Sequence, residues 1–113
     1  INTTSVSGIY ANPGQTNYGA AKAGIAAFTN IAAMELSRYG VTVNAVAPTF
    51  VYTPGTAERL DDPVYLRGVV DRIPMGKVGT IADVAGAVVY LASDAGGMVN
   101  GAILPVDGGW TAQ

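Results

Sequence analysis

A nearly unbroken apolar run at residues 41–47 constrains the fold of this chain more than any other feature. Such a run is typical of a parallel strand that is covered on both faces. It follows an alanine-rich segment predicted as a helix from about Thr16 or Asn17 to Arg38, with Gly40 where a left-handed residue often ends a helix. A long helix leading into a buried strand predicts an α/β fold built on a parallel sheet.

The remaining elements fit the same sheet. Residues 1–4 form a short β-prone run, and residues 101–106 are predicted as a last strand. Because Pro105 has no amide hydrogen, this strand should lie at a sheet edge or have its end free. Pro48 is expected to stop the middle strand. Asp62 and Pro63 are typical of a helix cap followed by proline at the first helical position. Residues 80–83 resemble a capping box, so a further helix begins near Ile81 and runs to about Ser93.

Composition excludes several classes of function. Only 12% of the residues are charged, against about 25% in an average soluble domain, and the formal charge of −2 is spread without runs. We therefore expect no nucleic-acid partner. The chain has no cysteine and no histidine, which removes thiolate nucleophiles, the usual general base and the commonest metal ligand, so no metal site is expected. No apolar run is long enough to span a membrane, and we expect a soluble, cytoplasmic protein.

Tyr18 and Lys22 are the first candidates for chemistry. At a spacing of four residues they share one helix face about a turn apart. An ammonium held within several ångströms of a phenol stabilises the phenolate, which makes a tyrosine usable as a proton donor or acceptor. The alternative is a helix-start tyrosine beside a solvated lysine.

Ser5 and Ser7 follow the first strand at its carboxyl end, where ligands meet the chain in parallel α/β sheets. Their hydroxyls either face a ligand or only satisfy backbone groups of a turn.

In combination and order, these motifs resemble the carboxyl-terminal half of a short-chain dehydrogenase/reductase, over nearly all 113 residues. The matching segments are Ser5, the Tyr18–Lys22 pair, Asn44–Pro48 and Val106–Gly109. The resemblance implies part of a doubly wound Rossmann-type sheet with three strands, one long helix, a short cover helix and one further helix. It also implies an oxidoreductase in which Tyr18 is the acid/base, Ser5 binds the substrate oxygen, and Lys22 assists Tyr18 and binds the nicotinamide ribose.

The resemblance further implies NAD or NADP as cofactor. Beside Tyr18 and Lys22, the cofactor contacts would come from the segment after the middle strand, at Pro48, Val51 and Thr53. The family commonly has glycine after the proline, and this chain has Thr49.

The substrate is expected to be a small hydroxylated molecule such as a polyol or sugar derivative. Residues 54–79, polar and punctuated by proline, are predicted to cover it. The residues expected to shape the pocket carry hydroxyl, amide and phenol groups: Ser7, Tyr10, Asn12 and Tyr52. A 3-ketoacyl thioester reductase of the same family is one alternative. A non-catalytic, self-associating module is another.

The chain is expected to be incomplete at its amino end, because residues 1–4 begin as if within a strand and no glycine-rich phosphate loop is present. By itself it should not hold a dinucleotide. The family often forms tetramers, and we expect a homo-oligomer, dimer or tetramer. On another face of the helix that carries Tyr18 and Lys22, small and apolar residues form a second stripe. It packs either on another subunit or on a helix of the same subunit, and its residues are Ala20, Gly24, Ala27, Ile31 and Met34.

Overall fold

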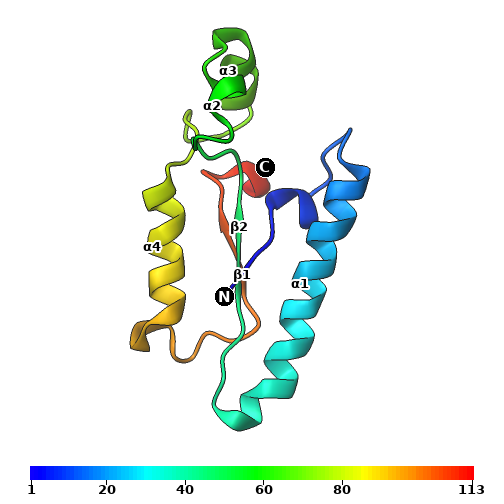
Figure 1. Cartoon of the computed structure of the whole chain (residues 1–113), viewed down its shortest axis with the longest axis vertical. Coiled ribbons are helices and arrows are strands. Elements are labelled where there is room, and N and C mark those ends of the chain that lie inside the picture. The colour runs from blue at the N-terminus through cyan, green and yellow to red at the C-terminus, as the bar shows by residue number, and fades with distance from the viewer.

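The computed structural model describes all residues from 1 to 113 and contains a sheet of three parallel strands with helices on two sides (Figure 1). The strands are β1 (Asn2–Thr3), β2 (Ala45–Pro48) and β3 (Ile103–Val106), in the order β1-β2-β3. Asn2 pairs with Ala45, and Ala45 in turn pairs with Ile103. The predicted α/β class with a parallel sheet is confirmed, and β3 with Pro105 lies at an edge of this sheet.

Two long helices flank the strands. Helix α1 (Thr16–Leu36) lies on one side and α4 (Ile81–Ala92) on the other (Figure 1). Helix α1 continues into a 3₁₀ turn, η2 (Ser37–Tyr39), and ends at Gly40 with φ 73°, as predicted. The capping box of α4 is present, since the Asp83 N–H donates to the Thr80 hydroxyl and the Thr80 N–H donates to the Asp83 carboxylate. No helix of the chain is both long and apolar enough to cross a membrane.

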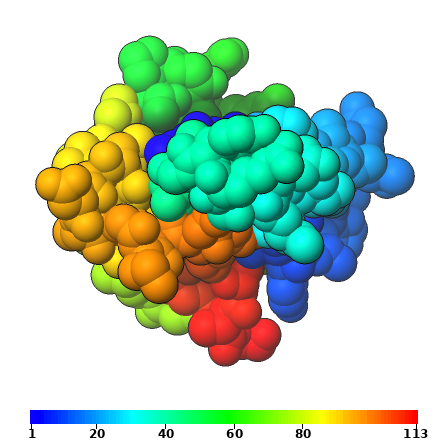
Figure 2. Space-filling view, turned by 90° about the horizontal axis from the view of Figure 1, so that it is seen from below, coloured from blue at the N-terminus to red at the C-terminus, as the bar shows by residue number.

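The middle and last strands are shorter than the sequence predicts. Residues 41–44 are not in β2, because two asparagine side chains replace part of the backbone pairing of this stretch. The Val43 N–H donates to the Asn100 side chain, and Asn44 bonds the Val99 carbonyl and the Ala102 N–H. Asn100 also donates to the Ala33 carbonyl, and the end of α1 lies against residues near 100 in Figure 2.

The predicted single cover helix is two short helices, α2 (Ala57–Leu60) and α3 (Pro63–Val70). Asp62 caps α3 as predicted, accepting from the N–H groups of Val64 and Tyr65. Both helices lie beyond the carboxyl end of β2 (Figure 1).

Trp110 anchors this cover to the sheet. Trp110 is the first residue of the 3₁₀ turn η4 (Trp110–Ala112) and is 2% exposed. Its indole packs in a buried cluster with Val6, Val69 and Ile73. The Phe50 ring lies 5.8 Å from it, and the Arg72 guanidinium lies 4.3 Å above its ring. One aromatic side chain therefore joins the turn after β1, the cover and the C-terminus.

The two faces of α1 differ in burial. On the face that begins with Tyr18 and Lys22, Thr29 and Ala32 are buried against the sheet, whereas Leu36 at its end is exposed. The small apolar stripe is exposed along its length, with Met34 80% accessible, and no helix of this chain covers it.

Candidate active site

The first wall of the site is the turn that follows β1. Ser5, 8% exposed, caps the 3₁₀ turn η1 (Val6–Gly8), and its hydroxyl accepts from the Ser7 N–H at 3.2 Å. Gly8 lies directly on helix α1, because a Cβ there would be 2.7 Å from the Lys22 carbonyl carbon. A Cβ at Gly19 would be 3.0 Å from the backbone carbonyl oxygen of Ser7. The turn and the helix thus touch backbone to backbone, which fixes Ser5 relative to α1.

Helix α1 places Tyr18 and Lys22 beside this turn. The Lys22 ammonium lies 5.6 Å from the centre of the Tyr18 ring and donates to the Thr3 carbonyl oxygen at 3.1 Å. The Lys22 carbonyl in turn accepts from the Thr4 hydroxyl at 2.6 Å. Tyr18 is 44% exposed, and its hydroxyl makes no hydrogen bond within the chain. The cation is therefore tied to the end of β1 and held next to the phenol.

Ser5 and Tyr18 line one cavity of about 240 Å³. The cavity lies between η1, the start of α1 and the connection after β2. It also contains four more of the residues predicted for the site, which are Ser7, Asn12, Val51 and Thr53. The other lining residues are Val6, Gln15, Thr49, Phe50 and Thr56.

Three side chains form a polar network in this cavity. The Ser7 hydroxyl donates to the Gln15 amide oxygen at 2.5 Å, and the Asn12 amide nitrogen donates to the same oxygen at 3.2 Å. The Asn12 nitrogen also reaches the Ser7 hydroxyl at 3.4 Å. The loop before α1 is therefore held by side chains that face the cavity.

Thr56 organises the opposite wall. Its hydroxyl accepts from the Thr53 N–H at 2.9 Å and donates to the Val51 carbonyl at 2.7 Å, while the Thr53 hydroxyl lies 3.1 Å away. The Val51 N–H makes no hydrogen bond within the chain. Because Val51 pairs with Gly79 as a parallel bridge, the turn is also fixed from its outer side.

Pro48, Val51 and Thr53 line a second, open and apolar cavity of about 530 Å³, which they share with α4. The helix contributes Ile81, Val84, Ala85, Val88 and Val89 to its lining. The three residues predicted for the cofactor in the β2 connection thus lie together on one surface, next to the Ser5–Tyr18 cavity.

Comparison with known proteins identifies the chain. The family model described as enoyl-(acyl carrier protein) reductase matches residues 1–111. A solved oxidoreductase of the short-chain dehydrogenase/reductase family from Burkholderia thailandensis superimposes with a TM-score of 0.90 at 38% identity, over 98% of this chain and 43% of that one. This chain belongs to the short-chain dehydrogenase/reductase family.

Relatives within the family carry different names. The 3-oxoacyl-(acyl-carrier-protein) reductase of Thermotoga maritima is 45% identical over 109 residues, which are 96% of this chain and 44% of the relative. A gluconate 5-dehydrogenase from Burkholderia cenocepacia, solved with NADP and tartrate, has a TM-score of 0.92 at 33% identity, over 99% of this chain and 44% of that one. The chain spans less than half of the length of these relatives.

Two predicted substrate residues lie away from the cavity of this family member. Tyr10 is exposed in the loop after η1 and is not among the lining residues. Tyr52 is exposed, and its hydroxyl donates to Asp61 at 2.8 Å. The hydrogen bond to the Asp61 carboxylate, together with its negative charge, raises the pKa of Tyr52 above its usual value. The structure does not bring Tyr10 and Tyr52 together with Ser5 and Tyr18.

Gln15 and Thr56 line the cavity although the sequence prediction omitted them. Gln15 lies just before the first residue of α1 and three residues before Tyr18, a position from which its side chain can face Tyr18. Thr56 follows Thr53 by three residues across Pro54 and Gly55, a spacing at which a hydroxyl commonly bonds back to a turn.

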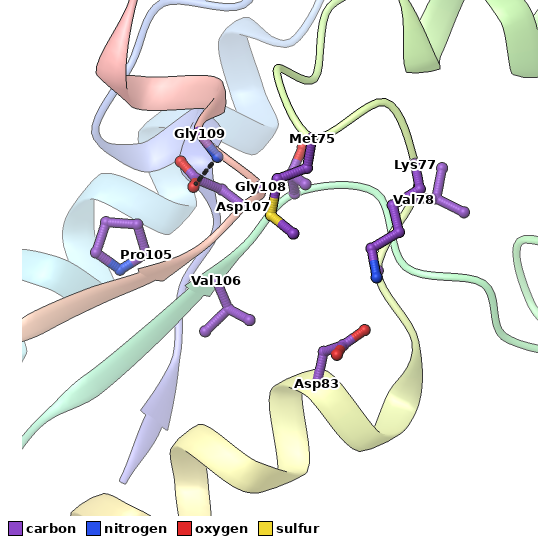
Figure 3. A pocket seen from close by; sticks show the side chains of 11 residues that line it. Met75, Lys77, Val78, Asp83, Pro105, Val106, Asp107, Gly108 and Gly109 are labelled. Carbon is purple, nitrogen blue, oxygen red and sulfur yellow. Dashed lines mark hydrogen bonds between the residues drawn. The ribbon is translucent and has the colours of Figure 1, made fainter.

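A third cavity, of about 330 Å³, lies beside β3 and contains two carboxylates (Figure 3). Asp107 accepts from Gly109 and Thr111. Although burial would raise the pKa of Asp107, these hydrogen bonds hold it below its ordinary value. The backbone and hydroxyl hydrogen bonds of Thr80 likewise lower the pKa of Asp83. Both carboxylates are committed to the fold, so this cavity offers no acid/base group near neutral pH.

Thr49 lines both this cavity and the Ser5–Tyr18 cavity. Its hydroxyl is buried without a hydrogen-bond partner. No cluster of three or more acidic, histidine or cysteine side chains could hold a metal ion.

Proposed function

We propose that this chain is the carboxyl-terminal half of an NAD(P)-dependent oxidoreductase that acts on an alcohol or carbonyl group of a small hydroxylated substrate. The observation that carries the proposal is the shared cavity of Ser5 and Tyr18, with the Lys22 ammonium 5.6 Å from the tyrosine ring. Ser5 and Tyr18, from two segments of the chain, thus border one place where a reacting oxygen can bind, and Lys22 lies beside Tyr18 outside the lining of that cavity.

Tyr18 is the proton donor and acceptor of this proposal. Its hydroxyl has no partner within the chain, so it is available to a substrate oxygen. The positive charge of Lys22 stabilises the phenolate that forms when Tyr18 gives up its proton. Ser5 steadies the same oxygen, because its hydroxyl hydrogen is not used by the bond that it accepts from Ser7. In alcohol oxidation Tyr18 takes the hydroxyl proton, and in carbonyl reduction it returns it.

The connection after β2 fits a nicotinamide cofactor. Pro48, Val51 and Thr53 face an open apolar surface suited to a planar ring, and the free Val51 N–H can donate to an amide oxygen. Lys22, on α1, donates its ammonium N–H to the Thr3 carbonyl at the end of β1, so the exposed ammonium lies at the carboxyl ends of the strands as well. When bound, NAD or NADP supplies the acceptor or the donor of the hydride. The relative from Burkholderia cenocepacia was solved with NADP, which supports this choice.

The substrate we favour is a polyol or sugar derivative. Eight of the eleven residues that line the cavity carry a hydroxyl or amide group, and the other three are Val6, Phe50 and Val51. Residues 54–79 would cover the site, with Phe50 and Trp110 as their anchor. A 3-ketoacyl thioester is the second candidate, because the Thermotoga maritima reductase is more similar in sequence than the gluconate dehydrogenase is. A cytoplasmic homo-oligomer, supported by the exposed stripe of α1, completes the proposal.

A spectroscopic assay of the full-length protein tests the function. The protein is mixed with NAD⁺ or NADP⁺ and a panel of polyols and sugar acids, and with NADPH and acetoacetyl thioesters, while the absorbance of the reduced nicotinamide is followed. Tyr18→Phe should lower kcat by about 10²–10⁴. Tyr39→Phe, outside the cavity, is the matched control and should keep full activity. A wild type that is inert toward every compound yet self-associates would favour the non-catalytic module.

A further inference from the structure

We propose that Gln15 recognises a second oxygen of the substrate, one or two carbons away from the carbon that reacts. This inference rests on the proposed oxidoreductase function and adds a specificity-determining residue to it. The ligand it selects carries a hydroxyl or carbonyl oxygen as hydrogen-bond acceptor, in addition to the oxygen that meets Ser5 and Tyr18.

The orientation of the Gln15 amide carries the inference. An amide oxygen has two lone pairs, and here both are occupied, by the Ser7 hydroxyl at 2.5 Å and the Asn12 amide nitrogen at 3.2 Å. The amide nitrogen of Gln15 makes no hydrogen bond within the chain. With its oxygen held from two directions, the side chain presents two unused N–H donors and no free acceptor.

The position of Gln15 decides which oxygen it meets. The Gly19 N–H donates to the Gln15 carbonyl at 2.7 Å, so the residue is fixed one turn before Tyr18. Its side chain lines the same cavity as Ser5 and Tyr18. Those two hydroxyls already meet the reacting oxygen, which leaves the N–H groups of Gln15 for another acceptor of the substrate. In a substrate of the proposed class, a polyol or sugar derivative, the next acceptor oxygen lies one or two carbons from the reacting carbon.

Ser7 and Asn12 are positioning residues in this scheme. They hold the Gln15 oxygen and so prevent the amide from turning its acceptor toward the substrate. A bound ligand that leaves the two N–H donors of Gln15 without an acceptor forms a less stable complex. A ligand that supplies the acceptor therefore binds more tightly than one that does not.

A matched set of alcohols tests the inference in the full-length protein. Butane-2,3-diol and butane-1,3-diol carry a second oxygen, whereas butan-2-ol lacks it. Gln15→Leu should lower kcat/KM for the better diol by about tenfold, the loss of one hydrogen bond, and change kcat/KM for butan-2-ol by less than about twofold. Gln15→Met, which has no N–H to donate and a side chain of similar length, should show the same selective loss. Ser7→Ala should show a smaller loss that is again confined to the diols.

The outcomes separate this inference from the proposed function. Equal losses for the diols and butan-2-ol, or no loss for either, would overturn the role of Gln15 while leaving the oxidoreductase intact. A wild type that is inert toward these alcohols and also toward every polyol, sugar acid and thioester of the panel would overturn the proposed function and the role of Gln15 with it. Melting temperatures of the variants within a few degrees of the wild type show that selective losses do not come from unfolding.

Discussion

The two segments that follow the carboxyl ends of β1 and β2 build opposite walls of one cavity and are held in different ways. The turn at residues 5–8 meets α1 backbone to backbone, because Gly8 has no side chain to separate them. The segment at residues 54–79 is held by backbone hydrogen bonds only near its end, at Met75 and Gly79, and elsewhere by side chains, chiefly Thr56, Trp110 and Phe50. The wall with the proposed reacting groups is therefore fixed by shape, whereas the wall proposed to cover the substrate depends on contacts that substitution can alter.

Trp110→Ala should have the largest effect, because Trp110 touches both segments. Truncating a buried tryptophan costs about 3–5 kcal/mol, since a cavity replaces its packing. We expect this loss in the free energy of unfolding, measured by urea denaturation, with faster amide hydrogen exchange in α2 and α3 than in α1. Met98→Ala, at a side chain that is 98% exposed, is the control. Equal exchange in α1 and the cover would break the contrast between the walls.

Gly8→Ala should damage the fixed wall. A Cβ at 2.7 Å from the Lys22 carbonyl carbon forces the turn away from α1, and overpacking of this kind costs about 1–3 kcal/mol. Because Ser5 moves with the turn, kcat should fall together with the melting temperature. The matched variant is Gly68→Ala in α3, where a Cβ meets nothing within 4 Å and should gain up to about 1 kcal/mol of helix stability. A silent Gly8→Ala would show that the backbone contact is dispensable.

Thr56→Val tests the adjustable wall. It keeps the shape of the side chain but removes the hydroxyl that joins Val51 and Thr53, at a cost of about 1 kcal/mol. We expect weaker binding of the nicotinamide cofactor, measured by quenching of protein fluorescence. The position of Ser5 should change little. Thr56→Ser retains the hydroxyl and should restore most of the affinity. If both variants bind like the wild type, Thr56 does not position this turn.

Asp107→Asn should have the smallest effect, and that effect should be present near neutral pH and fade in acid. The pKa of Asp107 is lower in the folded chain than in the unfolded one, so its contribution to stability is present above the unfolded value of about 3.9 and is lost as the pH falls through the folded value. The wild type should therefore lose stability below about pH 4 more steeply than the variant does. Thermal melts across this range measure the difference. Parallel curves would show that Asp107 titrates alike in both states.

Local chemistry made much of the fold predictable. The cap at Asp62, the capping box at Thr80 and the end of α1 at Gly40 each depend on residues within a few positions, and all three are present. The extents of β2 and β3 were not predictable, because Asn44 and Asn100 take over backbone hydrogen bonds across more than 50 residues of sequence.

The candidate site was likewise predictable from the sequence only in part. The pattern of Ser5, Tyr18 and Lys22 predicted groups that the structure places side by side. Gln15 could not be identified from the sequence, since its importance depends on which neighbours hold its amide. Tyr52 was predicted for the pocket, but the direction of a loop side chain is decided by its partner, here Asp61.

Pro105 has a consequence for how the molecule resists aggregation. Ala45 bonds to Ala102 and Thr49 to Val106, so alternate residues of this stretch turn their backbone groups toward β2, and Ile103 and Pro105 turn theirs outward. Proline has no N–H to offer there. A strand from another molecule that docked along this border would find a gap in the row of donors, which discourages the edge-to-edge growth that leads to fibrils.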